Sequence, residues 1–172
     1  MTHSITTRGL YLAAAFAIAM TNFTNCSDKE AAGYIGQSDI AVEDGKMTPE
    51  VMLSLGRLSD PQLSPDGKTI LYGVSYTSVP DNRSCRNLFL VNADGTCRRQ
   101  LTREGSSISC ARWTDGGRGI MYIQKGQIRK ATVRGLGGNS PKLVKKTVIS
   151  DIPAGISEFK LSPDGSRIMF VS

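Results

Sequence analysis

The strongest constraint on the fold is a five-residue stretch that occurs twice. Leu-Ser-Pro-Asp-Gly occupies residues 63–67 and returns at residues 161–165. A Ser at the first position, a Pro at the second and a Gly at the fourth favour a type I turn followed by a left-handed residue. Pro65 fixes its own φ, and Gly67 adopts positive φ without a Cβ clash. The stretch therefore predicts a tight corner between two antiparallel strands.

A degenerate copy of the corner lies between the other two. Residues 114–117 read Thr-Asp-Gly-Gly, so the hydroxyl and the fourth-position glycine are kept while the proline is not. The first turn positions are 50 and then 48 residues apart, and each corner is followed by Ile-Leu-Tyr, Ile-Met-Tyr or Ile-Met-Phe. A period near 50 with one strand meander per repeat is typical of a β-propeller. With a further turn at 93–96, the predicted structural turn residues are Ser64, Pro65, Asp66, Gly67, Asp94, Gly95, Ser162, Pro163, Asp164 and Gly165.

The repeats predict an all-β fold, a partial β-propeller with four-stranded blades. Central strands such as residues 88–91 and 120–123 are apolar at consecutive positions, which indicates that both faces of the sheet are covered. The repeats are assigned to residues 57–104, 105–150 and 151–172, which amount to about 2.4 blades. Propellers close with about four to eight blades, so the sequence is expected to be the front of a longer chain. In the first repeat, residues 97–101 are expected to form a polar fourth strand at the sheet edge.

Residues 1–25 are predicted to be a signal peptide. Arg8 supplies the positive n-region, and the 11 apolar residues at 10–20 are too few to span ~30 Å of hydrocarbon. Cys26 resembles the lipidation site of a bacterial lipoprotein. We therefore expect export to the periplasm or outer-membrane surface of a Gram-negative bacterium, with membrane contact only through a lipid anchor. Cleavage at Ala17–Ala19, giving a soluble secreted protein, and an uncleaved anchor are the alternatives.

Residues 26–47 contain scattered glycines and charges with no apolar period, which predicts a flexible tether. A short helix is expected over residues 48–56. Thr48 is the predicted N-cap, Pro49 occupies the first helical position, and Gly56 is expected to end the helix. A helix of this length does not stand alone in water, so it is expected to dock on the strands that follow.

The residue inventory excludes most catalytic machinery from this sequence. The one histidine is His3 in the leader, so no Ser-His-Asp triad, Cys-His pair or histidine-containing zinc site can form in the mature chain. Residues 155–159 begin like a nucleophile elbow but lack its closing glycine. The acids at 66, 94, 115 and 164 are explained by turns. No catalytic residue, cofactor-binding residue, metal ligand or cofactor is therefore predicted.

Two further features favour structural explanations. Between Asp115 and Asp151 there are eight bases and no acid, a pattern that a surface binding nucleic acid, anionic lipid or anionic glycan would need. The run has no interleaved aromatics, so solvated blade rims are favoured and no nucleic-acid partner is predicted. The Gly-rich stretch 135–138 is interpreted as a hairpin loop. After Cys26, the remaining thiols are Cys85, Cys97 and Cys110, for which no disulfide pairing or C-x-x-C metal motif can be argued.

A family resemblance rests on longer stretches of sequence. Residues 47–50 (Met-Thr-Pro-Glu), 55–68 from Leu55 through the first corner to Lys68, 92–96 (Asn-Ala-Asp-Gly-Thr) and 100–102 (Gln-Leu-Thr) look like the beginning of an exported prolyl oligopeptidase family serine peptidase. The nearest types are the dipeptidyl peptidase and acylaminoacyl peptidase branches. The resemblance covers about residues 47–172. TolB-like propellers share the corner motif, whereas the capped helix leading into the first blade is more specific.

The resemblance implies a propeller of seven or eight blades that gates the access of short peptides to a C-terminal α/β-hydrolase domain. The nucleophile, oxyanion hole, Asp and His would then lie outside these residues. Glu104 and Glu158 match by type alone the propeller acids that bind peptide amino termini in some members. The alternative is a non-catalytic TolB-like or WD40-like propeller that acts as an envelope interaction module, and a degenerate fragment is a third reading.

Overall fold

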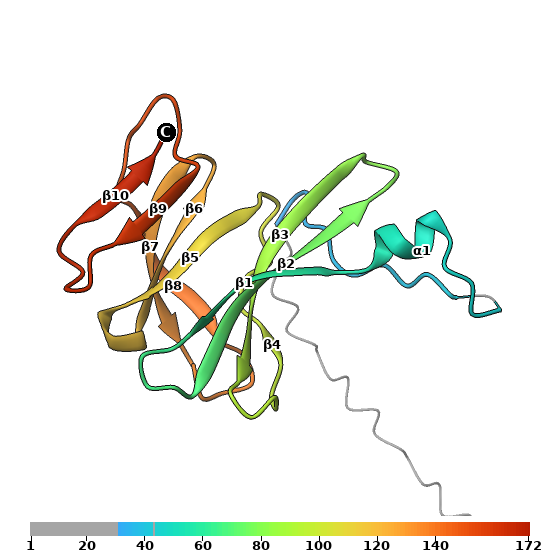
Figure 1. Ribbon diagram of the computed structural model, residues 1–172, viewed down its shortest axis with the longest axis horizontal. Helices are drawn as coiled ribbons and strands as arrows, with labels where there is room; N and C mark the ends of the chain where they lie inside the picture. Colours follow the sequence, from blue (N-terminus) through green and yellow to red (C-terminus); the bar gives the residue numbers. More distant parts are fainter. Residues whose placement is uncertain (1–30, 43) are drawn as a thin grey trace, which may run out of the picture.

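The computed structural model describes residues 31–42 and 44–172, which form one short α-helix and ten β-strands (Figure 1). In chain order the elements are α1 (Pro49–Ser54), β1 (Arg57–Leu63), β2 (Thr69–Ser78), β3 (Arg83–Asn92), β4 (Arg99–Gln100), β5 (Ile108–Thr114), the 3-10 turn η1 (Asp115–Gly117), β6 (Gly119–Gln124), β7 (Gln127–Arg134), β8 (Lys142–Val148), β9 (Glu158–Leu161) and β10 (Ile168–Val171).

The strands form two four-stranded antiparallel meanders and one hairpin. β1–β2–β3–β4 are neighbours in the first sheet, β5–β6–β7–β8 in the second, and β9 pairs with β10. We call these units blade 1, blade 2 and repeat 3; in Figure 1 they run from green through yellow and orange to red. This architecture confirms the predicted all-β, partial propeller-like fold.

The first corner is closed by a serine hydroxyl and an aspartate. Ser64 Oγ donates to Asp66 Oδ1 at 2.5 Å and accepts the backbone N–H of Thr69 at 2.9 Å. Gly67 takes φ +70°, the left-handed conformation that glycine adopts most readily. The corner at residues 162–167 repeats this pattern, with the hydroxyl donating at 2.6 Å and accepting at 2.9 Å. The two copies of the sequence motif therefore form the same local structure.

The middle corner spans the same number of residues with a different turn. Trp113 pairs with Ile120 across this corner, seven positions further along the chain, as Leu63 pairs with Ile70 across the first corner. The turn is shifted by one residue, because Arg118 N–H donates to the carbonyl of Asp115 and Asp115 itself takes φ +53°. Aspartate visits this conformation more readily than most residues do. The repeat length is therefore kept without the proline.

The two blades share one apolar core. Leu71, Leu88 and Leu90 of blade 1 pack with Ile120 and Tyr122 of blade 2, and each of the five is at most 1% exposed. We call the side of a repeat that faces the next repeat its forward face, and the opposite side its backward face. In the core between the blades, the forward face of blade 1 therefore packs on the backward face of blade 2.

Repeat 3 is joined to blade 2 in the same way. Ile123 and Ile128 on the forward face of blade 2 pack with Phe159 of β9, which is 1% exposed. The face-to-face stacking inferred from the apolar strands is therefore present at both junctions.

A buried amide holds the chain where it leaves blade 1. Asn87 Oδ1 accepts bonds from Thr102 Oγ1 at 2.9 Å and from the N–H of Glu104 at 2.8 Å, and its Nδ2 donates to the Glu104 carbonyl at 3.1 Å. Thr102 Oγ1 also accepts the N–H of Leu88 at 2.9 Å. Buried polar groups need such partners, so this amide fixes the crossover to blade 2.

Blade 2 has the equivalent arrangement with different residues. Gln127 Oε1 accepts bonds from Ser150 Oγ at 2.7 Å and from the N–H of Ile152 at 3.1 Å, and its Nε2 donates to the Ile152 carbonyl at 2.8 Å. Ser150 Oγ accepts the N–H of Ile128 at 2.9 Å. We call Asn87 and Gln127 the exit amides. They place successive repeats relative to one another.

Helix α1 begins as predicted, but its end has a different cause. Thr48 Oγ1 accepts the N–H of Val51 at 3.3 Å, and Val51 is buried against blade 1. The helix ends at Ser54, and the capping residue is Leu55 in an extended conformation. A Cβ on Gly56 would lie 2.7 Å from the ring of Tyr76, so glycine is required here for close approach to the sheet and not as a left-handed cap.

The predicted fourth strand of blade 1 is shorter than residues 97–101. β4 consists of Arg99 and Gln100 only. Arg99 does not protect a free edge as expected: its guanidinium donates to the carbonyls of Leu136 and Gly138, at 2.7 Å and 2.9 Å, and to Asn92 Oδ1 at 2.8 Å. It therefore anchors the Gly-rich β7–β8 hairpin loop of blade 2.

Residues 31–36, which we call the N-terminal strap, are docked on blade 1. Ile35 is buried and packs with Tyr76 and Cys85. Arg83 donates to the carbonyls of Gly33 and Gly105, tying the strap to the crossover between the blades. The expectation of a flexible tether over 26–47 therefore differs from the structure in this stretch. Its short, glycine-rich sequence has no apolar period from which docking could be predicted.

The strap can be tested with a pair of glycine substitutions. A Cβ on Gly105 would overlap the carbonyl oxygen of Ala32, whereas a Cβ on Gly137 would meet no atom within 4 Å. We expect Gly105→Ala to destabilise the fold by about 1–3 kcal/mol, the usual cost of overpacking, and Gly137→Ala to have little effect. Thermal unfolding of the two variants measures this. Equal melting temperatures would contradict the docked strap.

Candidate functional site

Bulges in the first strands of both blades create the most distinctive cluster of charged side chains. The register of β1 shifts between Ser59 and Gln62, and that of β5 shifts between residues 109 and 112. Asp60 and Cys110, which are 50 residues apart, occupy the same place in these bulges and take φ +52° and +48°. A bulge redirects the side chains around it. Here the redirected side chain of Asp60 reaches blade 2.

Asp60 binds an arginine of the neighbouring blade. Arg112 Nη1 lies 2.9 Å from Asp60 Oδ1 and 2.8 Å from Oδ2, and the two side chains are 24% and 23% exposed. Arg86 approaches the same carboxylate, with Nη2 at 3.8 Å from Oδ2, and donates to the Ser59 carbonyl at 3.3 Å. We call these three side chains the Asp60 cluster. It links the first strands of blades 1 and 2.

Arg86 lies flat against blade 1 because Gly73 beneath it has no side chain. A Cβ on Gly73 would overlap the guanidinium, and Arg86 Nε is buried without a hydrogen-bond partner among the described residues. Burial lowers the pKa of Arg86, and the nearby charge of Arg112 acts in the same direction, while Asp60 opposes the shift. Two guanidiniums thus share one carboxylate, which leaves one excess positive charge at the junction.

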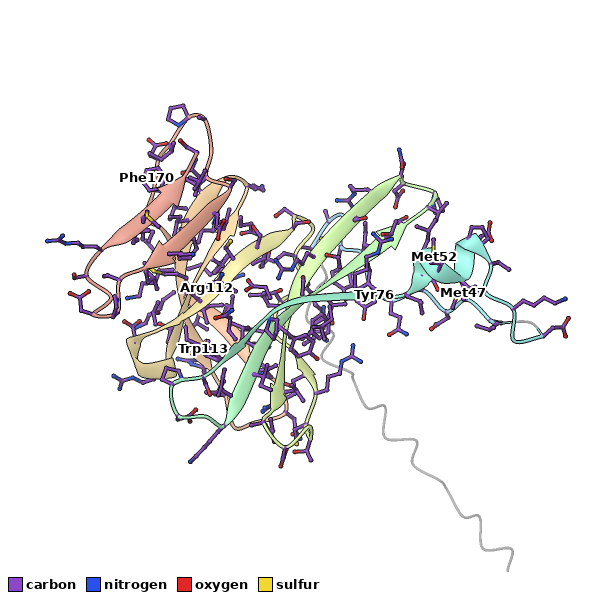
Figure 2. All side chains as sticks on the ribbon, in the orientation of Figure 1. Met47, Met52, Tyr76, Arg112, Trp113 and Phe170 are labelled. Carbon is purple, nitrogen blue, oxygen red and sulfur yellow. The ribbon has the colours of Figure 1, made fainter. Side chains whose placement is uncertain are left out.

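Trp113 adds a second link beside the ion pair. Its Nε1 donates to the carbonyl of Gln62 at 3.2 Å, and its ring packs against the core between the blades. Figure 2 shows Arg112 and Trp113 next to each other where the two blades meet. Guanidinium and indole N–H groups stay protonated at neutral pH and act only as hydrogen-bond donors. The site is therefore suited to holding the blades in place and to electrostatic recognition, and not to acid–base catalysis.

The two candidate acids have different surroundings. Glu104 lies on the crossover between the blades, where its carboxylate forms an ion pair with Lys146 of β8. Glu158 is exposed at the start of β9, opposite Val171, at the repeat position that Asp60 occupies in blade 1. The structure does not bring the two together, and only Glu158 presents its carboxylate to solvent in a strand equivalent to that of Asp60.

The eight bases between 115 and 151 are distributed over blade 2. Lys130 pairs with Asp115 at 2.9 Å and Lys146 with Glu104, so acids outside or at the end of the run neutralise part of it. Arg129 lies on β7 with its Nε buried. The remaining members are Arg118, Lys125, Arg134, Lys142 and Lys145.

The three described cysteines are free thiols in different environments. Cys85 is buried and donates to the Glu104 carbonyl at 3.2 Å, and burial raises the pKa of its thiol. Cys97 is exposed, while Cys110 lies in the β5 bulge beside Arg86. Across residues 31–42 and 44–172, no group of three or more His, Cys, Asp or Glu side chains is placed to hold a metal ion.

The aspartates of the predicted turns serve their own turns. Asp94 accepts bonds from the hydroxyl and N–H of Thr96, at 2.6 Å and 2.9 Å, and these bonds lower its pKa. Hydrogen bonds from Ser162 and then Ser166 lower the pKa of Asp164 to about 2. Cys26 and His3 lie outside the described residues. In the part of the chain that the structure describes, no helix is both long and apolar enough to cross a bilayer.

Comparison with known proteins identifies the relatives of this chain. It is 30% identical to Dipeptidyl-peptidase 5 of Porphyromonas endodontalis over 132 residues, which are 76% of this chain and 18% of that protein. It is 34% identical to Dipeptidyl-peptidase 5 of Porphyromonas gingivalis over 145 residues, which are 81% of this chain and 21% of that protein.

This chain is related to dipeptidyl peptidases. It spans about a fifth of the length of these two relatives, and no family model matches it. The resemblance predicted from the helix and first blade is therefore confirmed at the level of a dipeptidyl peptidase relation.

A double-mutant cycle tests whether the Asp60 cluster joins the blades. Asn accepts the left-handed backbone of residue 60, so Asp60→Asn removes the charge with little backbone strain. Asp60→Asn leaves two guanidiniums without their carboxylate, and Arg112→Gln leaves Asp60 with only the more distant Arg86. We therefore expect each change to cost about 2 kcal/mol, with a coupling energy of about 1–3 kcal/mol. Urea unfolding of the four proteins gives these values.

The matched control is the pair of Asp115 and Lys130. Asp115 also has positive φ, but the two side chains are 46% and 43% exposed. Asp115→Asn with Lys130→Gln should show coupling below about 0.5 kcal/mol. A coupling at Asp60 no larger than that of the control would show that the cluster does not join the blades.

Proposed function

We propose that this chain is the amino-terminal propeller portion of an exported serine peptidase of the dipeptidyl peptidase type. In this proposal its blades gate the entry of short peptides to an α/β-hydrolase domain encoded outside these residues. The observation that carries the proposal is the similarity to two proteins named Dipeptidyl-peptidase 5, which extends over about four fifths of the chain.

The blade architecture supports a gating role. Forward and backward faces stack at both junctions, and the exit amides and the Asp60 cluster hold successive repeats in fixed positions. A rigid wall of blades can exclude folded proteins while it admits extended peptides. The Asp60 cluster would then set the spacing of the first strands, which line the central channel of a propeller.

The chemistry of the residues agrees with a role outside the catalytic centre. The sequence contains no histidine after His3, so the general base of a serine peptidase has to come from another part of the polypeptide. Under this proposal the exposed carboxylate of Glu158 is available to a peptide amino terminus, whereas that of Glu104 is held by Lys146.

The location is part of the same proposal. An exported protein with a lipid on Cys26 would lie in the periplasm or on the outer-membrane surface of a Gram-negative bacterium. Support comes from the sequence pattern of residues 1–26 and from relatives in two Porphyromonas species.

Activity measurements can separate a peptidase from a binding module. The 172-residue polypeptide should release no dipeptide from fluorogenic dipeptidyl substrates and should not react with a serine-directed phosphonate. An antibody raised against the chain should isolate, from the source bacterium, an activity that releases dipeptides and is abolished by that phosphonate. Pre-immune serum is the control.

Two outcomes would contradict the proposal. Phosphonate-sensitive turnover by the 172-residue polypeptide itself would place the catalytic residues within this chain. Isolation of the antigen without dipeptidyl peptidase activity would favour the alternative, a non-catalytic envelope interaction module.

A further inference from the structure

The Asp60 cluster contains more hydrogen-bond donors than its one carboxylate can use. Arg112 donates through Nη1 alone, to both oxygens of Asp60 at 2.9 Å and 2.8 Å and to the carbonyl of Ala111 at 2.8 Å. Its Nη2 and Nε donate to no group within residues 31–42 and 44–172. A guanidinium that binds a carboxylate with its full fork uses two nitrogens in parallel. The edge of Arg112 that carries Nη2 and Nε is therefore available to a second acceptor.

Arg86 has an even poorer set of partners. Its side chain is 15% exposed, and its Nη2 lies 3.8 Å from Asp60 Oδ2, which is beyond hydrogen-bond distance. Among the described residues, its guanidinium donates only to the Ser59 carbonyl, at 3.3 Å, and its buried Nε has no partner. Buried charged groups in proteins are normally paired and hydrogen-bonded. The guanidinium of Arg86 therefore needs an acceptor that these residues do not supply.

The local sequence departs from strand preferences to place Arg86 here. Gly73 lies in the interior of β2, where glycine weakens a strand and is typical of places that a ligand or another chain approaches closely. A Cβ on Gly73 would overlap the guanidinium of Arg86. Asp60 and Cys110 take left-handed backbone conformations in the two adjoining bulges. Departures of this kind that gather in one place are typical of functional sites.

The cluster is open to solvent on one side. β1 and β5 are the first strands of two complete four-stranded blades, and each pairs with a single neighbour among the described strands. The side chains of Asp60 and Arg112 are 23% and 24% exposed, and Figure 2 shows Arg112 at the junction of the blades, next to Trp113. In the proposed propeller, first strands line the central channel. The open side of the cluster would then face that channel.

We propose that the Asp60 cluster binds a carboxylate group of a peptide between Arg86 and Arg112. With Asp60, the site then contains two guanidiniums and two carboxylates, so no excess charge is left at the half-buried junction. The bound carboxylate is a C-terminus or an acidic side chain, since both have the same chemistry. The binding of an oxyanion follows from the cluster alone, whereas the choice of a peptide as its source rests on the proposed function.

Nitrogen-15 NMR of the arginine Nε–Hε groups in the 172-residue polypeptide tests the site. The probes are acetyl-trialanine with a free C-terminus, the same peptide as its C-terminal amide, acetyl-Ala-Glu-Ala amide, and inorganic phosphate, all in a chloride-poor buffer. We expect a peptide that carries a carboxylate to shift the signals of Arg86 and Arg112 until they saturate, whereas the trialanine amide should leave them unchanged. The peptide that binds more tightly identifies the source of the carboxylate.

Variants measure how much each guanidinium contributes. Arg112→Gln should weaken binding of the carboxylate peptide about tenfold or more, because it removes a charged donor. Arg86→Lys keeps the charge but loses the planar fork, and should weaken binding about threefold or more. The matched control is Arg134→Gln, since Arg134 is an exposed arginine on β7 outside the cluster and its loss should leave the affinity unchanged. Circular dichroism checks that each variant is folded.

Two kinds of result would overturn the proposal. Shifts with phosphate but with neither carboxylate peptide would exclude a peptide carboxylate as the ligand. Signals of Arg86 and Arg112 that respond no more than that of Arg134, or an affinity that Arg112→Gln leaves unchanged, would exclude the site itself. These measurements involve no hydrolysis, so their failure is distinguishable from failure of the proposed peptidase function, which is tested by isolating dipeptidyl peptidase activity.

Discussion

The packing of one blade face on the next is the interaction on which this structure depends. Leu71, Leu88 and Leu90 face away from their own sheet, and they are buried because side chains of blade 2, Ile120 and Tyr122 among them, pack over them. Truncating one such residue to alanine typically costs about 2–5 kcal/mol, so the junction accounts for a large share of the stability of a domain this small. Blade 1 and blade 2 therefore have to form together.

Polar interactions give this apolar packing its geometry. Leucine and isoleucine side chains tolerate sliding, whereas an exit amide with three satisfied hydrogen bonds allows one position of the crossover. The Asp60 cluster adds a directional ion pair between the first strands, and the N-terminal strap fixes the crossover from outside through Arg83. Together these contacts fix the position of each repeat relative to the next. The proposed gating of peptides by size would need such a rigid arrangement of blades.

Turns and strand meanders could be predicted from the sequence, whereas side-chain contacts between residues far apart in the sequence could not. The corner motif and the apolar strands sufficed to predict the meanders, because turn chemistry and strand pairing are local. The exit amides could not be predicted in this way, because Asn87 and Gln127 differ in residue type and their hydroxyl partners lie 15 and 23 residues away in the sequence. The ion pair between Arg112 and Asp60 joins residues 52 positions apart. It depends on a β-bulge that no motif in the local sequence predicts.

Native-state hydrogen exchange in Leu88→Ala tests the shared core most directly. If the two blades bury one core, loss of this side chain in β3 should reduce the protection of the slowest amides by a similar factor in β2, β3, β6 and β7, because these strands open together. Loss of protection confined to β2 and β3, with β6 and β7 unchanged, would show that the blades are independent units and would contradict the account.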